Sequence, residues 1–143
     1  MKRFIAVLIL TCMLCLTAGG CSNGLTSNKK IIKLYRDNEE SFLEAAESQD
    51  FAALESIKGV LGISTHEDHT EIRFGGSGMG SNTDYYEIWW TEKKIASVLL
   101  GQIASRYDAI PDGNGIRYKE KEGDNEFYAE PIGNGFYYVE LHF

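Results

Sequence analysis

The C-terminal segment places carboxylates, tyrosines and one histidine at alternating positions. Successive residues of a strand point to opposite faces of a sheet, so two strands at 125–131 and 136–143 would gather six such side chains on one face: Glu126, Tyr128, Glu130, Tyr138, Glu140 and His142. Paired carboxylates can act as acid and base in glycoside hydrolysis, with aromatic rings stacking on sugars. The same set can form a binding surface anchored by its tyrosines, or simply the solvated face of an antiparallel sheet.

The other face of this hairpin is apolar, and we expect it to pack against the core. It carries Tyr137, Val139, Leu141 and Phe143. The segment DYYEIWWT at 84–91 divides in the same way, and we add its Tyr85 and Trp89 to the candidate binding surface. Neither G-x-S-x-G nor H-E-x-x-H occurs in the sequence, so we expect a binding surface with no catalytic residue and no cofactor.

Two short motifs resemble ligand-binding motifs but lack features that such sites require. In HEDH, His66 and His69 are weak candidates to chelate a divalent ion, with Glu67 or Asp68 adding oxygen. A structural site normally needs four rigidly held ligands, and this segment lies between two expected strands, so we predict an exposed polar loop. In GGSGMG at 75–80, a phosphate loop would require a helix and usually a lysine directly afterwards. The sequence SNTDYYEIWW follows instead, which predicts a flexible or bulged connection.

The elements that position these residues follow from hydrophobic periodicity. Apolar residues at helical spacing predict a helix within 29–51: Ile31, Leu34, Tyr35, Phe42, Leu43, Ala45 and Ala46. A second short helix is predicted at 51–58. After Gly59 the period becomes two, which predicts strands near 60–65, 70–75, 84–91, 95–100, 115–121, 125–131 and 136–143. Short turns between them favour antiparallel pairing. We therefore predict an α+β fold in which one or two N-terminal helices pack on a mainly antiparallel meander sheet.

Composition limits the class of protein and its partners. The chain has 143 residues, of which 43% are hydrophobic, and it contains two Trp, eight Tyr and seven Phe. These values favour one packed domain, which we place at 29–143. The net charge is −7 and no block of Lys or Arg occurs, so nucleic acid is not an expected partner.

The N-terminus has the pattern of a signal peptide. Lys2 and Arg3 precede the apolar run 4–16, which is shorter than a membrane span, and small residues follow. The sequence Ala18-Gly19-Gly20-Cys21 resembles the lipobox of bacterial lipoproteins, although the commonest lipoboxes carry leucine at the position of Ala18. This resemblance implies that diacylglycerol is attached to the Cys21 sulfur and that residues 1–20 are removed. The alternative is ordinary secretion, which would leave Cys21 as an unpaired extracellular thiol.

The resulting expectation is a lipid-anchored protein on the extracytoplasmic face of the cell membrane. Residues 21–28 would be the tether, and Cys12 and Cys15 would leave with the signal peptide. The tail 123–143, with YYEIWW upstream, is similar to small uncharacterised lipoproteins of Gram-positive bacteria, which implies a surface lipoprotein but no activity. We expect a binding or interaction module for an unidentified protein or small molecule. The alternatives are a small surface hydrolase using Glu126, Glu130 or Glu140, and a lipoprotein that protects against a toxin or phage.

Overall fold

The computed structural model describes residues 23–79 and 82–143. The expected signal peptide at 1–20 and the lipobox cysteine Cys21 lie outside the described residues. The chain folds as an α+β structure in which N-terminal helices pack on an antiparallel sheet, which confirms the predicted fold class. Among the described residues, no helix is long and apolar enough to cross a membrane.

The N-terminal helical segment is divided in two. Helix α2 (Asn28–Asp37) and helix α3 (Glu39–Ser48) meet at Asn38, which has non-helical backbone angles. The Asn38 side chain donates a hydrogen bond to the Leu34 carbonyl at 2.8 Å, so it caps the end of the first helix. The asparagine side chain can hydrogen-bond to nearby backbone groups in this way, so asparagine is more favourable at a helix end than in a helix interior. The predicted second helix is a 3₁₀ helix, η1 (Ala52–Ser56).

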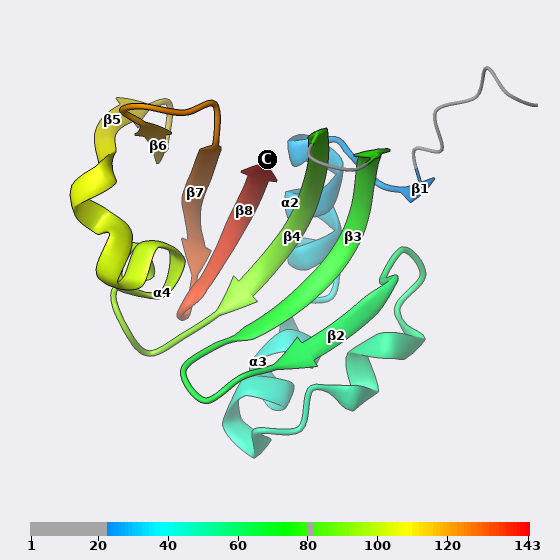
Figure 1. Ribbon diagram of the computed structural model, residues 1–143. Coiled ribbons are helices and arrows are strands. Elements are labelled where there is room, and N and C mark those ends of the chain that lie inside the picture. The colour runs from blue at the N-terminus through cyan, green and yellow to red at the C-terminus, as the bar shows by residue number, and fades with distance from the viewer. Residues whose placement is uncertain (1–22, 80–81) are drawn as a thin grey trace, which may run out of the picture.

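The sheet consists of two antiparallel meanders joined at their edges. Its strands are β1 (Asn23–Gly24), β2 (Gly62–Thr65), β3 (Thr70–Met79), β4 (Asn82–Trp90), β5 (Tyr107–Asp112), β6 (Gly115–Glu120), β7 (Glu126–Gly133) and β8 (Phe136–His142). The order is β1-β3-β4-β8-β7-β6-β5, and β2 also pairs with β3. Strand β8 therefore returns to the middle of the sheet beside β4, and β7 lies on the other side of β8 (Figure 1).

The connection from β4 to β5 differs from the sequence prediction. Residues 95–100, expected as a strand, form helix α4 (Ile95–Leu100), which continues into the 3₁₀ helix η2 (Gly101–Arg106). A six-residue apolar run does not distinguish a strand from a short buried helix by periodicity alone. Strand β5 was not predicted because Pro111 suggested a turn, yet β5 is an edge strand, where proline is tolerated.

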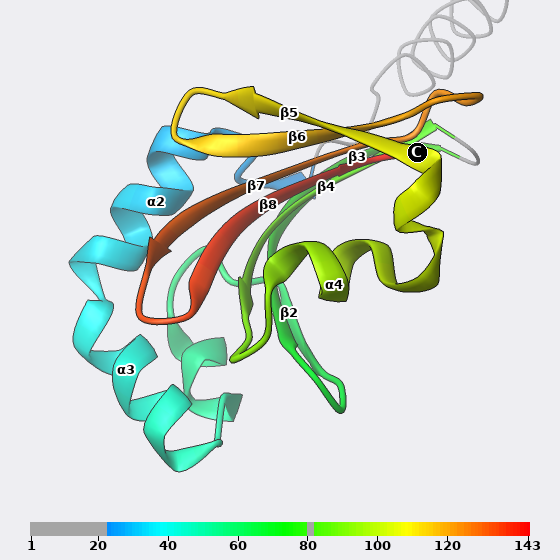
Figure 2. The same ribbon diagram turned by 90° about the vertical axis from the view of Figure 1, so that its left-hand side faces the viewer.

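Both faces of the sheet are covered, as Figure 2 shows. On one face, Ile31, Tyr35 and Phe42 of the N-terminal helices pack in a core with Ile88 and Tyr138 of the sheet. On the other face, Leu100 of α4 belongs to a second core, together with Trp89, Tyr107, Tyr118, Phe127, Ala129 and Val139. We call these the α2–α3 face and the α4 face.

Part of the expected tether is paired with the sheet. Asn23 and Gly24 form β1, which lies antiparallel to Gly75 and Gly76 of β3, and the Leu25 amide donates to the Phe74 carbonyl at 2.8 Å. Gly24 has a φ of +86°, and a Cβ added there would lie 2.0 Å from the Phe74 carbonyl oxygen. Only glycine allows this close approach of two backbones. Residues 23–25 are thus held against the edge of β3.

Candidate functional site

The register of β7 and β8 places the six predicted residues of the C-terminal hairpin on the α2–α3 face. Glu126 is opposite His142, Tyr128 opposite Glu140, and Glu130 opposite Tyr138. This face is not the solvated one, however, because Tyr138 is 0% and Tyr128 is 7% exposed, and both belong to the core beneath α2 and α3. The amphipathic helices need an apolar surface, and the tyrosine rings help to provide it. The two tyrosines are therefore core residues and not surface anchors.

The polar ends of these buried tyrosines are paired with carboxylates. The Tyr128 hydroxyl donates to Glu130 Oε2 at 3.0 Å, and the Tyr138 hydroxyl donates to Glu140 Oε1 at 2.8 Å. Burial, followed by the Glu130 carboxylate, raises the pKa of Tyr128 to about 12. Burial and the Glu140 carboxylate also raise the pKa of Tyr138. Both phenols therefore stay protonated and act as hydrogen-bond donors.

His142 lies between two acidic side chains at the open end of this face. Its Nε2 is 3.4 Å from Glu140 Oε2, and its Nδ1 is 2.7 Å from Asp84 Oδ1. The hydrogen bonds to Glu140 and Asp84 raise the pKa of His142 to about 8. In return, His142 lowers the pKa of each of these carboxyl groups. The three groups form a charged network at neutral pH.

Glu126 is neutralised by cations from β6. Burial alone would raise the pKa of Glu126, but hydrogen bonds from Lys119 and Arg117 lower it. The Arg117 guanidinium also lies over the Tyr128 ring, 5.0 Å from its centroid. A glycosidase needs one carboxyl group with a raised pKa as its general acid. The lowered pKa values of Glu126 and Glu140 disfavour the hydrolase hypothesis at these two residues.

Tyr85 and Trp89 lie on the opposite side of the sheet from the hairpin set. Tyr85 is opposite Leu141, and Trp89 is opposite Tyr137, so both belong to the α4 face. The predicted binding surface is therefore not one surface. The sequence pattern predicts that side chains alternate along β4. It does not predict which of the two sets lies on the same side of the sheet as the carboxylates of β8, because that depends on the register between the two strands.

On the α4 face, Trp89 joins the two histidines of the HEDH motif. The motif is the turn between β2 and β3, and it is closed by a hydrogen bond from the His66 amide to the His69 carbonyl at 2.8 Å. The His66 and His69 rings stack with centroids 4.5 Å apart, and His69 also stacks on Trp89 at 4.5 Å. The expected exposed loop is thus an ordered turn with its imidazoles side by side.

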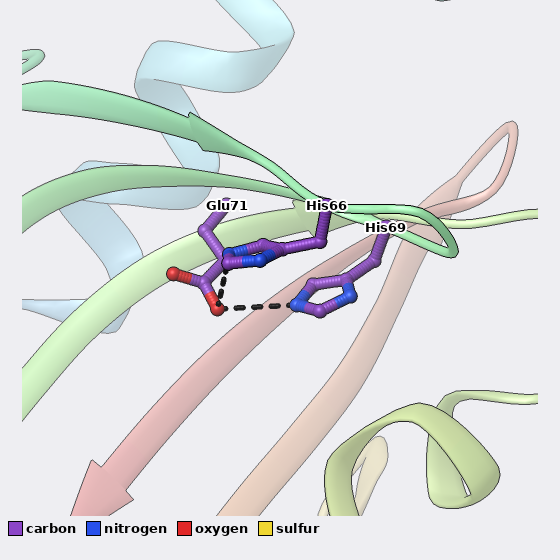
Figure 3. Close-up of side chains that lie close together, drawn as sticks. All are labelled: His66, His69 and Glu71. Carbon is purple, nitrogen blue, oxygen red and sulfur yellow. Dashed lines mark hydrogen bonds and ion pairs between the residues drawn. The ribbon is translucent and has the colours of Figure 1, made fainter.

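Glu71 completes this cluster (Figure 3). Its Oε1 lies 3.1 Å from His69 Nε2 and 3.4 Å from His66 Nε2. Glu67 and Asp68 were the oxygen donors expected from the sequence, and Glu71 was not among them. Strand alternation was the available signal, because positions 69 and 71 share a face. Asp68 instead accepts a hydrogen bond at the far side of the His69 ring, with Nδ1 and Oδ1 2.7 Å apart.

Trp89 connects this cluster to an ion pair whose carboxylate is buried. Its indole Nε1 donates to Glu87 Oε2 at 2.6 Å, and Glu87, which is 1% exposed, accepts a second hydrogen bond from Arg73 Nε at 2.9 Å. The Arg73 guanidinium lies 5.0 Å from the centroid of the Tyr85 ring. Buried charges are tolerated when they are paired and hydrogen-bonded. This network fixes the indole against which His69 packs.

The glycine-rich motif does not form a phosphate loop in its described part. Residues 75–79 continue β3, and the next described element is the strand β4 rather than the helix that a phosphate loop requires. The motif was expected to be a connection between strands, but its described part is strand, and the register shift lies just before it, between Arg73 and Gly75. Gly80 lies outside the described residues.

Comparison with known proteins found no matching family model, no matching curated protein and no matching solved structure.

Proposed function

We propose that the chain is a lipid-anchored binding module on the extracytoplasmic face of the cell membrane. The support for the anchor is the signal-peptide pattern followed by Ala18-Gly19-Gly20-Cys21. Two acyl chains give durable membrane attachment, at ~0.8 kcal/mol for each buried CH₂ group. The observation that carries the proposal is the position of β1, which begins two residues after Cys21 and is hydrogen-bonded to the domain.

This position gives the anchored domain a definite orientation. Two residues span at most ~7 Å, so the β1 end of β3 would lie next to the lipid headgroups. The HEDH turn stands at the opposite end of β3 (Figure 1). At ~3.3 Å per residue, His69 is roughly 20 Å farther along the strand than Gly76. The histidine turn would therefore face away from the bilayer.

A binding role fits the α2–α3 face better than hydrolysis does. Its carboxylates are paired with Arg117, Lys119 and His142, and the pKa values of Glu126 and Glu140 are lowered. One accessible part of this face is a groove of about 510 Å³ between α2 and the β5–β6 turn. Its lining residues are Asn28, Lys29, Ile32, Lys33, Arg36, Asp37, Asn114 and Glu130. This groove is the candidate site for the unidentified protein or small-molecule ligand.

Metabolic labelling tests the anchor. Cells fed an alkyne fatty acid should tag the wild-type protein, and a Cys21→Ala variant should lose both the tag and its sedimentation with membranes. The removal of Cys12 and Cys15 with the signal peptide makes Cys21 the only cysteine available for acylation. An untagged wild-type protein would overturn the lipid anchor.

Energy transfer to headgroup-labelled lipid tests the orientation. Asn82→Cys lies at the β3–β4 end and Glu67→Cys at the HEDH turn, and both side chains are exposed. Each variant, lipidated at Cys21 and labelled with a maleimide dye, is reconstituted in vesicles. We expect several-fold higher transfer from position 82 than from position 67. Equal transfer would contradict a fixed orientation.

Photo-crosslinking in living cells tests the groove. A photoreactive amino acid at Lys29 should give a discrete adduct, whereas the same group at the exposed Glu55, which lies outside the groove, should not. Identical adduct patterns at both positions would count against the groove as the binding site.

A further inference from the structure

We propose that His66, His69 and Glu71 bind a single divalent transition-metal ion, with Zn²⁺ as the expected metal and water as the fourth ligand. The two imidazole nitrogens and one carboxylate oxygen lie within 4.8 Å of one another. Two histidines and one carboxylate with an open fourth position form a known class of zinc ligand set. This site is independent of the lipid anchor and of the α2–α3 groove.

The two separations between Glu71 and the histidines match the size of the ion. Zn–N and Zn–O bonds of ~2.0–2.1 Å in a tetrahedron place neighbouring ligand atoms ~3.3 Å apart. Glu71 Oε1 is 3.1 Å from His69 Nε2 and 3.4 Å from His66 Nε2. An ion can therefore replace the hydrogen bonds of this trio without a rearrangement of the backbone.

The His69 ring is oriented as a metal ligand requires. Metal-binding histidines usually donate their other ring N–H to a carboxylate, which fixes the tautomer and the ring orientation. The contact between His69 Nδ1 and Asp68 Oδ1, at 2.7 Å, fills this role and leaves Nε2 directed at Glu71, where an ion would take the place of the hydrogen bond and use the Nε2 lone pair. The stacking of His69 on Trp89 holds the ring from one side, and its side chain is 12% exposed.

His66 supplies the adjustable ligand and the access route. Its ring is stacked on His69 at an interplanar angle of 16°, and both lone pairs reach one ion only if the rings tilt apart. The His66 side chain is 47% exposed, so it has space for that tilt. The same exposure leaves the fourth coordination position open to water or to an external ligand.

Titration of the metal-free protein with ZnCl₂ tests the site. Calorimetry should give one ion per chain, and Co²⁺ should give the intense visible absorption of tetrahedral coordination. His66→Gln and Glu71→Gln should each weaken binding by at least tenfold. Asp68→Asn, which keeps all three ligands and changes the partner of His69 Nδ1, should weaken it by roughly 10-fold to 100-fold. His142→Gln, a histidine on the other face, should bind as the wild type does.

Two outcomes would overturn the proposal. One is the absence of saturable binding of Zn²⁺, Co²⁺ or Ni²⁺ at 1:1 stoichiometry. The other is wild-type affinity in both His66→Gln and Glu71→Gln. If a variant fails to fold, NMR of the wild-type protein decides. The ring protons of His66 and His69 must shift on addition of Zn²⁺ while those of His142 do not, and the reverse pattern excludes the site.

Discussion

The imidazole of His69 stacks on the indole of Trp89, with ring centroids 4.5 Å apart and planes inclined by 27°. The indole in turn donates to the buried carboxylate of Glu87. One tryptophan thus joins an imidazole at the end of a turn to an ion pair inside the α4 face. This connection makes Trp89 both a structural support and an optical reporter for the histidine cluster.

The bond between Trp89 and Glu87 should be measurable as a coupling energy. Trp89→Phe leaves a buried carboxylate short of one hydrogen-bond donor, which should cost about 1–3 kcal/mol in the free energy of unfolding. In a Glu87→Gln background the same substitution should cost less. Urea denaturation of the two single variants and the double variant gives the coupling. A coupling near zero would contradict the contact.

The network of His142, Glu140 and Asp84 should make stability depend on pH. The pKa of His142 is raised from 6.5 to about 8 in the folded state, chiefly by Glu140 and Asp84, so its stabilisation is complete below pH 6.5 and is lost as pH rises through 8. The carboxyl groups have lowered pKa values, so their stabilisation is lost in acid, below their usual values of 3.8 and 4.5. The network should therefore be strongest between about pH 5 and 6.5.

Two measurements check this pH dependence. Urea denaturation at pH 6 and pH 9 should show a loss on the order of 1 kcal/mol in the wild type that is absent in His142→Gln. NMR titration of the His142 ring should give a pKa near 8. Titration at 6.5 or below would mean that the ion pairs do not form in solution.

The burial of Tyr138 predicts a marked difference between two substitutions. Tyr138→Phe removes only the hydrogen bond to Glu140 and should cost about 1 kcal/mol. Tyr138→Ala also empties the core beneath α2 and α3, so it should cost about 3–5 kcal/mol. Thermal denaturation followed by circular dichroism distinguishes the two. A small effect of Tyr138→Ala would mean that the tyrosine lies on a solvated surface, as the sequence suggested.

The conformation of residues 95–100 predicts which side chains of this segment matter. Leu100 is 6% exposed at the end of α4, whereas Ile103 in η2 is 40% exposed. Leu100→Ala should therefore destabilise the fold by about 2–3 kcal/mol, and Ile103→Ala by less than about 1 kcal/mol. Equal losses in chemical denaturation would argue against the packing of α4 on the sheet.

The pairing of β1 predicts an effect specific to one glycine. Gly24→Ala would bring a Cβ within 2.0 Å of the Phe74 carbonyl oxygen, so β1 should detach and the Leu25 amide should exchange its hydrogen at least tenfold faster. Gly62→Ala is the matched control, because a Cβ there meets nothing within 4 Å. Hydrogen-exchange mass spectrometry of the N-terminal peptide compares them. Unchanged exchange in Gly24→Ala would mean that β1 is not stably paired.

Much of the fold could be predicted from local patterns. Alternation and turn residues located the β7–β8 hairpin, and helical spacing located α2 and α3. The break at Asn38 and the helix at 95–100 were missed because each depends on a competition that the pattern does not resolve. Asparagine can stand inside a helix or cap its end, and the pattern does not distinguish the two. A short apolar run can form a strand or a helix, depending on which conformation covers the sheet face better.

The candidate site was less predictable because it depends on long-range register. Alternation placed Glu126 and Glu140 on one face, but only the pairing of β4 with β8 shows that Trp89 lies on the other. The position of Glu71 beside two histidines follows from the closure of the HEDH turn. Composition likewise does not predict that helices cover both faces of the sheet.

The arrangement of strands at the two edges of the sheet bears on crowding. On one side, the edge is formed by two short strands, β1 with two residues and β2 with four, which pair with different parts of β3. On the other side the outermost strand β5 contains Pro111, which has no N–H to donate. A protein held on a bilayer, as we propose for this one, diffuses in two dimensions and meets its own copies far more often than in solution. Sheets with open edges would then tend to join into aggregates. The short and proline-bearing edges would allow these domains to remain separate molecules at high density on the membrane.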